Sequence, residues 1–567
     1  MLHRASLTVV IALVASLACT SSAAPPATSP GAGYRASAPD RPGGTAVLAD
    51  FELPQTLTPL TARTDAELRV ATLLFAPLWG LDPQLRPYPD LARRVPTPAN
   101  GGVRTDRDGR SMTVDVRLVP DLRWNDGQPI TADDVIFTWN ALRDPGLRAL
   151  APPGLDRIQR MDKRSDSEVV WTFDGIDAAY VQLGAGLPVL PAHRLRSIAP
   201  PAWTRADYFQ RPDVVSGPFM LADVAAGDHL TLAANPQYAD GRAAAGAYPD
   251  GDAPFDHAPH LGRVVVQAWP SKGAEVQALL AQGADAGFHL LPDDLADLQG
   301  ATGMGPAVTT GLRDEFLNPN HVVDTATGQA PPWVDDPRVL QALAEALDRS
   351  TLVRDVLAGS GRAARGLYPR ALASGSALPA GPSLDAARRL LDAARWRPGA
   401  DGVRTRGGQR LAFSLVGICD RPNIDLELDR LRRQWLPLGA AVTTSCRPRD
   451  AFLQLNAAGA FDMTVYSNGW APDPSAWAAV GTTGQPENWN RCHDRALDAD
   501  LARVDATLDL GGRRAAAAGA EREWLRYGCT IPLFEWPDVR EVSTRLRNFA
   551  PDPAAADTWN AADWWMA

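Results

Sequence analysis

The sequence predicts an α/β protein that folds into more than one lobe. Its 567 residues exceed what one hydrophobic core usually holds, so we expect two or three lobes. Segment 111–118 (SMTVDVRL) alternates apolar and polar residues, as a half-buried strand does, and a helix pattern follows from Thr131. The same order returns later, where a strand pattern at 411–416 precedes a helix pattern near 425–436. Alternating strands and helices are typical of α/β folds.

The composition is that of a soluble globular protein and argues against nucleic-acid binding. Hydrophobic residues make up 45% of the chain and charged residues 22%, which are ordinary values. The net charge is −10, and the sequence contains no basic stripe that would neutralise phosphates. We therefore expect no nucleic-acid partner.

The first residues are typical of an export signal. His3 and Arg4 precede an apolar run, 7–18, that is too short to span a bilayer. Cys19 follows Ser16-Leu17-Ala18 and resembles the lipidated cysteine of a bacterial lipoprotein box, although the box prefers Leu where Ser16 stands. We expect a signal peptide at 1–18, lipid attachment at Cys19 and a flexible tether at 19–42, which is rich in Ser, Ala, Pro and Gly. The alternative is ordinary cleavage in the Ala-rich stretch that follows.

Cysteine number favours disulfides in the folded part. Apart from Cys19, the chain has Cys419, Cys446, Cys492 and Cys529. An even number in an exported protein favours disulfides, and four cysteines allow three pairings. We favour Cys419–Cys446 and Cys492–Cys529, because these are neighbours along the chain. A metal site is the alternative, but the sequence has no CxxC pair.

The most informative stretch is 124–139 (WNDGQPITADDVIFTW). Asn125-Asp126-Gly127 predicts a turn, and Thr131 predicts the N-cap of a helix whose apolar stripe includes Trp139. Physically this is an ordinary strand–turn–helix unit. Its residues closely resemble the signature of family 5 extracellular solute-binding proteins, the receptors of peptide, oligopeptide and nickel ABC importers.

Further segments resemble the same family in the correct order, from about residue 43 to the end. Segment 190–193 (LPAH) and segment 215–219 (VSGPF) resemble its markers for leaving an inserted lobe. Asp336-Pro337 predicts the start of a helix over 338–349 (RVLQALAEALDR), a stretch that resembles a hallmark of the family. A second short helix is expected from Ser350 to Gly359. Segment 531–535 (IPLFE) resembles its strand that returns to the first lobe.

The resemblance implies a two-lobed periplasmic-binding-protein type II fold with an additional inserted small lobe. The expected boundaries are 43–80 for the first part of lobe I, 81–211 for the inserted lobe II, 212–315 for the second part of lobe I, 316–535 for lobe III and 536–567 for the C-terminal return to lobe I.

The resemblance also implies where ligand binds. In family peptide receptors, a Gly-Trp is followed three residues after the Trp by an Asp that pairs with the peptide ammonium, and Trp470 and Asp473 hold that spacing. A buried carboxylate suits an ammonium, because either charge alone is costly to desolvate. Asn468 and Tyr466, just upstream, are further candidate contacts. The alternative is that Asp473-Pro474 is only a turn.

The function implied is that of a receptor which captures a peptide-like solute between its lobes and delivers it to an ABC permease. We expect no catalytic residues, cofactor or bound metal, and a monomer tethered by its lipid in the periplasm or at the outer face of the cytoplasmic membrane. Asp256, His257 and His260 are possible metal ligands, but the Pro-rich loop around them offers no supporting ligands.

Three other functions remain open. An oligosaccharide receptor would use some of the 17 Trp as stacking platforms, and a nickel-chelate receptor is known in the same family. A secreted hydrolase is disfavoured, because the sequence has no GxSxG or HExxH motif. Fold does not decide between the ligands.

Overall fold

The structure is a computed structural model. It describes residues 34–567, except 52, 63, 153, 245, 250–257, 322–330, 332, 335, 373–377, 380, 486 and 555. The signal peptide, Cys19, Asp256 and His257 therefore lie outside the described residues, and the tether is described only from Tyr34. Within the described part, no helix is both long and apolar enough to cross a membrane.

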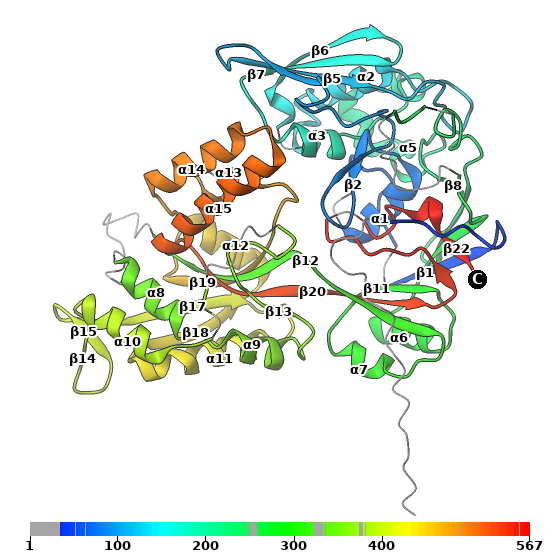
Figure 1. Ribbon diagram of the computed structural model, residues 1–567. Helices are drawn as coiled ribbons and strands as arrows, with labels where there is room; N and C mark the ends of the chain where they lie inside the picture. The colour runs from blue at the N-terminus through cyan, green and yellow to red at the C-terminus, as the bar shows by residue number, and fades with distance from the viewer. Residues whose placement is uncertain are drawn as a thin grey trace, which may run out of the picture. The chain divides into compact units, whose positions relative to one another are not determined.

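A large mixed sheet organises the fold (Figure 1). Its strands in spatial order are β18 (Ala441–Arg447), β17 (Ala412–Ile418), β19 (Met463–Gly469), β12 (Met304–Pro319), β20 (Ile531–Ser543), β11 (Ala286–Leu290), β1 (Thr45–Asp50), β10 (Arg263–Ala268), β9 (His229–Ala234) and β8 (Phe219–Ala225), with β13 (Arg362–Ala363) paired to β20.

Two long antiparallel strands, β12 and β20, join the halves of this sheet. At one end β12 pairs with β19, from Arg313↔Gly469 to Pro319↔Met463. At the other end β20 pairs with β11, which is parallel to β1. The two strands thus cross between a half built from the early chain and a half built after residue 304. The predicted boundary between lobes I and III, at residues 315 and 316, falls inside β12.

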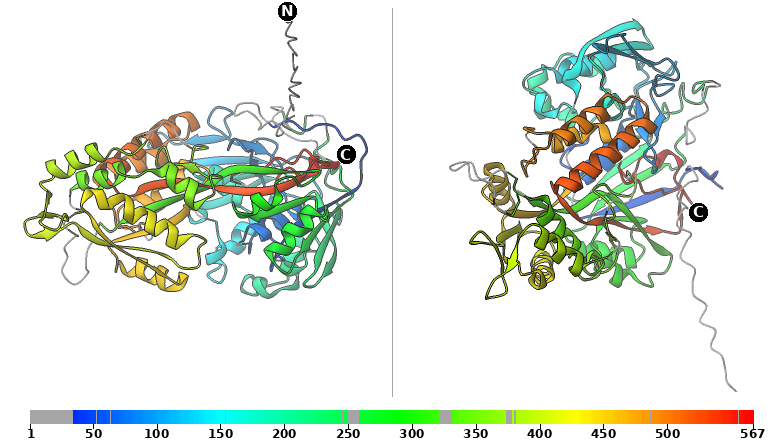
Figure 2. Two further views of the ribbon diagram at one scale, coloured as in Figure 1. Left: turned by 90° about the horizontal axis from the view of Figure 1, so that it is seen from below. Right: turned by 60° about the vertical axis from the view of Figure 1, so that its left-hand side comes forward.

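Helices flank each half, and their ends follow from capping. Those packed near β1 and β11 are α1 (Asp65–Leu74), α6 (Lys272–Leu280) and α7 (Asp294–Leu298). Those of the second half are α8 (Pro337–Glu345), α9 (Arg349–Val356), α10 (Leu384–Ala393), α11 (Ile424–Trp435), α12 (Arg449–Ala458), α13 (Ala478–Gly481), α14 (Arg495–Ala506) and α15 (Leu510–Tyr527). Figure 2 shows α14 and α15 lying along each other.

The helix predicted over 338–349 ends earlier, at Glu345, and the second short helix begins at Arg349 rather than at Ser350. Asp336 caps α8 and Pro337 opens it, as the sequence indicated. However, the Asp348 side chain accepts a hydrogen bond from the Thr351 amide at 3.0 Å and so caps α9. An N-cap residue has non-helical backbone, so α8 has to end before it.

A separate antiparallel sheet forms the inserted lobe. Its strands in order are β4 (Val103–Thr105), β5 (Ser111–Arg117), β7 (Glu168–Asp174) and β6 (Ile158–Ser165). The helices of the lobe are α2 (Ala132–Leu142), α3 (Tyr180–Gly186), α4 (Ala192–Leu195) and α5 (Asp207–Gln210). Thr131 caps α2 in a capping box with Asp134, as predicted for the cap. Trp124 and Trp171 are fully buried in the core that this lobe shares with β1 and α1.

The remaining elements are short. They are the paired strands β2 (Trp79–Leu81) and β3 (Pro87–Pro89), β14 (Arg397–Pro398), β15 (Arg404–Arg406) and β16 (Gln409–Arg410), and β21 (Leu546–Arg547) and β22 (Trp565–Met566), with 3-10 turns η1 (Arg148–Leu150), η2 (Leu155–Arg157), η3 (Pro200–Arg205), η4 (Leu436–Leu438), η5 (Pro474–Ala476) and η6 (Ala561–Asp563).

The disulfides join the cysteine pairs that the sequence favoured. Cys419 directly follows β17 and is bonded to Cys446 on the neighbouring β18, with their Cα atoms 4.9 Å apart. Cys492 and Cys529, 5.4 Å apart between Cα atoms, link the segment before α14 to the segment after α15. Both bridges belong to the half of the molecule that is built after residue 304.

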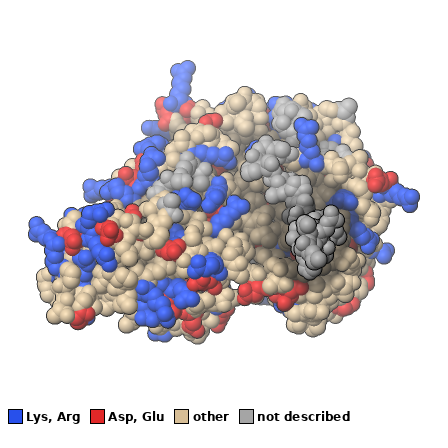
Figure 3. Space-filling view, turned by 60° about the horizontal axis from the view of Figure 1, so that its bottom comes forward, with Lys and Arg blue, Asp and Glu red and all other residues tan. Residues whose placement is uncertain are grey.

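The surface carries both signs of charge. On the face drawn in Figure 3, Lys and Arg side chains are interspersed with Asp and Glu. Several ion pairs of the described residues join such exposed neighbours, as in Arg410–Asp401. Pairs of this kind contribute little to stability.

Candidate ligand-binding cavity

A cavity of about 930 Å³ opens beside the crossing strands. Its wall is formed by α1, the β2–β3 hairpin, the end of α3, the end of β11, facing parts of β12 and β20, and residues from 552 to 562. Gly469 and Pro472 complete the wall from the second half of the molecule. The cavity lies where several parts of the chain meet, and its volume is within the usual range for ligand sites.

A bulge in β12 shapes the wall of this cavity. The ladder between β12 and β20 pairs Thr310 with Pro537 and then Asp314 with Glu535, so residues 311–313 stand opposite Trp536 alone. Pro537 has no N–H to donate, and proline within sheets is found at such irregular places. Gly311 allows the close approach, because a Cβ atom there would collide with the carboxylate of Asp538 in its present position.

The bulge brings Arg313 and Trp536 together at the cavity wall. The guanidinium of Arg313 lies over the indole of Trp536, 4.8 Å from the ring centroid. Both residues line the cavity, and Arg313 is exposed. Among the described residues, no carboxylate oxygen lies within 4.0 Å of the Arg313 guanidinium nitrogens.

A buried network of charged residues fixes the position of the Trp536 side chain. Its indole N–H donates to a carboxylate oxygen of Glu315 at 2.8 Å. Glu315 and Glu427 are fully buried, and both pair with Arg421. Burial and the nearby Glu315 carboxylate raise the pKa of Glu427, and Arg421 opposes that rise.

The other two arginines of the cavity wall, Arg69 and Arg540, are each paired with a carboxylate of the protein. Arg69 pairs with the buried Asp50 and lies over the Phe288 ring, 4.3 Å from its centroid. A guanidinium nitrogen of Arg69 is 2.9 Å from Nε2 of His289. Burial, together with Arg69 and other cations, lowers the pKa of His289 to about 3, so this imidazole is neutral and accepts the hydrogen bond.

The third arginine of the wall, Arg540, stands between two carboxylates. Its Nε lies 2.7 Å from Oδ1 of Asp557, and its Nη2 lies 3.9 Å from Oδ2 of Asp538. It also donates to the hydroxyl of Thr309 at 2.9 Å. Burial raises the pKa of Asp538, and the nearby Arg540 and Arg313 oppose that rise.

The fold and the family follow from comparison with known proteins. The model of bacterial extracellular solute-binding proteins, family 5 (Middle) matches residues 86–490. The chain belongs to this family. Protein XP55 of Streptomyces lividans is 28% identical over 366 residues, 64% of this chain and 59% of that protein. The oligopeptide-binding protein AppA of Bacillus subtilis is 23% identical over 393 residues, 66% of this chain and 63% of that protein. The chain therefore spans about three fifths of the length of these two relatives.

Solved structures of family 5 proteins confirm the predicted fold. AppA from Bacillus subtilis in complex with a nonapeptide has a TM-score of 0.66 at 19% identity and covers 94% of this chain and 100% of that chain. NikZ from Campylobacter jejuni in complex with Ni(L-His) has a TM-score of 0.68 at 18% identity. This match covers 92% of this chain and 99% of that chain. The protein thus has the two-lobed type II fold of this family. The family is one of solute-binding proteins.

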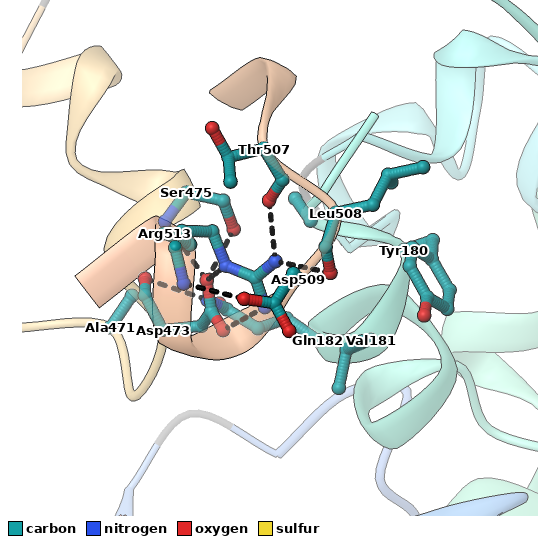
Figure 4. A network of polar contacts seen from close by, with 12 residues as sticks. Tyr180, Val181, Gln182, Ala471, Asp473, Ser475, Thr507, Leu508, Asp509 and Arg513 are labelled. Carbon is teal, nitrogen blue, oxygen red and sulfur yellow. Dashed lines mark hydrogen bonds and ion pairs between the residues drawn. The ribbon is translucent and has the colours of Figure 1, made fainter. Parts of the chain in front are cut away.

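In this family 5 chain, the residue predicted to hold a ligand ammonium has an internal partner. Asp473 is only 7% exposed, and its carboxylate accepts two hydrogen bonds from Arg513, at 2.8 and 2.7 Å. One oxygen also accepts from the Ser475 amide at 3.0 Å, as an N-cap of η5. Figure 4 shows the Asp473 and Arg513 side chains directed toward each other. The ammonium role of Asp473 stays a prediction, and an incoming cation would compete with Arg513.

The three neighbouring candidates also have internal contacts. Trp470 is buried among aromatic rings, with Tyr368 edge-on at 4.9 Å and Phe316 at 5.7 Å between centroids. Tyr466 stacks on Phe452, and Asn468 lies on β19 opposite Asp314. Their ligand roles likewise stay predictions. The cavity lining from this segment comes instead from the intervening Gly469 and the following Pro472.

The Asp473 segment contacts the inserted lobe. The Gln182 amide of α3 donates to the backbone carbonyl of Asp473 at 2.9 Å, and the Ala178 amide donates to the carbonyl of Asp505 at 3.1 Å (Figure 4 includes Gln182). Burial is the main cause that raises the pKa of Asp505 to about 7, and the carboxylates of Asp177 and Asp473 add to it. Gln182 also lines the cavity, so this contact lies next to it.

Sequence reasoning did not find Arg313 and Trp536. Arg313 falls near the end of the expected second part of lobe I, 212–315, and Trp536 directly follows segment 531–535, so neither was singled out. The one signal in the sequence is proline directly after Trp536, since proline is unusual in the middle of a central strand.

Proposed function

We propose that this protein is the solute-binding receptor of an ABC importer. It captures a peptide-like solute in the cavity beside the crossing strands and delivers it to a membrane permease. Strands that cross between two lobes are suited to act as a hinge, and a ligand that contacts both lobes shifts the protein toward its closed state. We also propose that it has no catalytic activity and acts as a monomer.

The observation that carries this proposal is the cavity itself. Its wall combines α1, the end of α3 and the β12–β20 bulge with Gly469 and Pro472 from the second half, so one ligand can contact all of them. Its volume of about 930 Å³ suits a ligand the size of a short peptide. A peptide is further supported by the AppA relative, which is described as an oligopeptide-binding protein.

Native mass spectrometry of the purified protein tests the ligand class. The protein is measured as purified and again after denaturation and refolding, which removes co-purified ligand. We expect adducts with the masses of short peptides in the first sample and their loss in the second. Unchanged peptide masses after long incubation support a receptor, whereas cleaved peptides would show an enzyme. Adducts with sugar masses or with nickel would contradict the peptide assignment.

We propose that the mature protein is a lipoprotein, exported through residues 1–18 and anchored at Cys19. The support is the apolar run that ends at a small residue before cysteine. Growth with labelled palmitate should label the wild type and leave Cys19→Ala unlabelled. A label-free wild type with a mature N-terminus beyond Cys19 would contradict the anchor.

A further inference from the structure

We propose that Arg313 binds a carboxylate of the ligand. The proposal rests on the proposed function, because it names the chemical group that the cavity recognises. It depends on three observations: the bulge that directs Arg313 to the cavity, the fixed indole beneath it, and the charge balance of the wall.

The bulge explains why Arg313 is available. In a regular ladder, residues 311–313 would each face a residue of β20, but they stand opposite Trp536 alone. Bulges redirect side chains and occur next to functional sites. Gly311 allows this path because its missing side chain leaves room for the Asp538 carboxylate. Arg313 is therefore exposed at the cavity wall although it belongs to a central strand.

Trp536 orients the guanidinium without using its hydrogen-bond donors. The guanidinium carbon lies over the ring, 4.8 Å from its centroid, which is the position of a cation–π contact. The indole is itself fixed by its hydrogen bond to Glu315, which Arg421 holds in turn. A cation–π contact uses none of the N–H donors of the guanidinium, and its planar fork matches the two oxygens of a carboxylate.

Charge balance distinguishes Arg313 from the other arginines of the wall. Asp50 compensates Arg69, and Asp557 compensates Arg540. Within the described part of the chain, Arg313 has no carboxylate within ion-pair distance. A ligand carboxylate placed there would gain a charged hydrogen bond in a partly enclosed site, where such bonds are strong.

The acidic residues of the wall do not cancel this preference, because each is buried, engaged elsewhere or largely exposed. Asp552 and Asp557 are buried, and both raise the pKa of Arg540. Asp90 is paired with the buried Arg242 at 2.9 Å. Asp65 is largely exposed and lies 3.7 Å from His289. Asp538 is packed against Gly311 and faces Arg540 as well as Arg313.

Two sources could supply the carboxylate, the C-terminus of a peptide or an acidic side chain. Three pools of synthetic pentapeptides distinguish them. The first contains no Asp or Glu and has free C-terminal carboxylates. The second has the same sequences as C-terminal amides. The third consists of amides that each contain one Glu. Binding of each pool to ligand-free, refolded protein is measured by calorimetry and native mass spectrometry.

We expect the wild type to bind the first or the third pool at least about tenfold more tightly than the second, since a hydrogen bond between charged groups contributes that much or more. The preferred pool identifies the source. Arg313→Gln should lose the preference while its binding of the second pool stays the same. Arg313→Lys should keep part of it, because the charge remains but the planar fork is lost. Arg107→Gln, which removes an exposed charge outside the cavity, is the matched control and should behave as wild type.

Equal binding of the first and second pools by the wild type, with no gain for the third, would overturn the proposal and leave the receptor function intact. An unchanged preference in Arg313→Gln would do the same. If the wild type binds no pool, the peptide function fails, and Arg313 is then tested with citrate and succinate in a thermal-shift assay. Stabilisation of the wild type but not of Arg313→Gln would support the carboxylate site by itself, and equal responses would overturn it.

Discussion

Two arginines near the cavity show how the same side chain serves different purposes. Arg513 is 2% exposed at its side chain and is held by both carboxylate oxygens of Asp473. Arg313 is exposed at the cavity wall and stacks on an indole. The first arginine is satisfied within the protein and maintains structure, whereas the second has its donors directed to where a ligand would lie. Charge compensation separates the two roles more clearly than sequence motifs do.

The largest effect should come from breaking the Asp473–Arg513 pair. Asp473→Ala leaves the Arg513 charge buried without its partner, and we expect a loss of about 3–5 kcal/mol in the free energy of unfolding. The double variant Asp473→Ala/Arg513→Met should lose less free energy of unfolding than the sum of the losses in the two single variants. Urea unfolding of all three variants measures these losses. Asp108→Ala, an exposed loop residue, is the control. A stable Asp473→Ala protein that no longer binds peptide would instead support the ammonium role of Asp473.

The second effect concerns the disulfide next to the Asp473 region. Cys492 and Cys529 belong to the same hydrophobic cluster as Trp470. Replacing both by Ala should reduce the free energy of unfolding by about 2–4 kcal/mol, because the bridge restricts the unfolded chain. The carboxylate preference at Arg313 should be unchanged, since that residue depends on the crossing strands. A lost preference in the folded variant would show that the two regions are coupled.

A pH effect sharpens the comparison further. The folded pKa of Asp505 is raised to about 7, whereas an unfolded aspartate titrates near about 4. Between these values the folded state holds a proton that the unfolded state has released. The contribution of Asp505 to stability is therefore greatest below about pH 4 and is lost as the pH rises to 7.

Asp505→Asn removes this titration. Its melting temperature should exceed that of the wild type at pH 8, and the difference should shrink toward pH 4. Burial also raises the pKa of Glu541 to about 7. Glu541 contributes equally to both proteins, so it does not affect the difference between their melting temperatures. Parallel melting-temperature curves from pH 4 to 8 would contradict the assignment.

The smallest effect on stability is expected at Arg313. Arg313→Gln should unfold within about 0.5 kcal/mol of the wild type, because an exposed residue without an ion pair contributes little. Urea unfolding of Arg313→Gln, with Arg107→Gln as the control, would measure this difference in the free energy of unfolding. A loss comparable to that of Asp473→Ala would show that Arg313 is structural as well.

Much of the fold could be predicted because its signals are local. Thr131 and Asp336-Pro337 mark helix starts through groups that bond within one turn of the chain. The segment 124–139 carries the family resemblance without any knowledge of its neighbours. The end of α8 was placed too late because Asp348 was interpreted as part of the first helix rather than as the N-cap of the second.

The sequence by itself determined the family, the α/β lobes and the cysteines available for bridging. Only the tertiary structure decided which charges are compensated. Asp473 and Arg513 are 40 residues apart, and the bulge that exposes Arg313 exists only once β12 pairs with the distant β20. Both facts depend on contacts between remote segments. The electrostatic state of a side chain is set by its neighbours in space, and these follow from packing rather than from the order of residues along the chain.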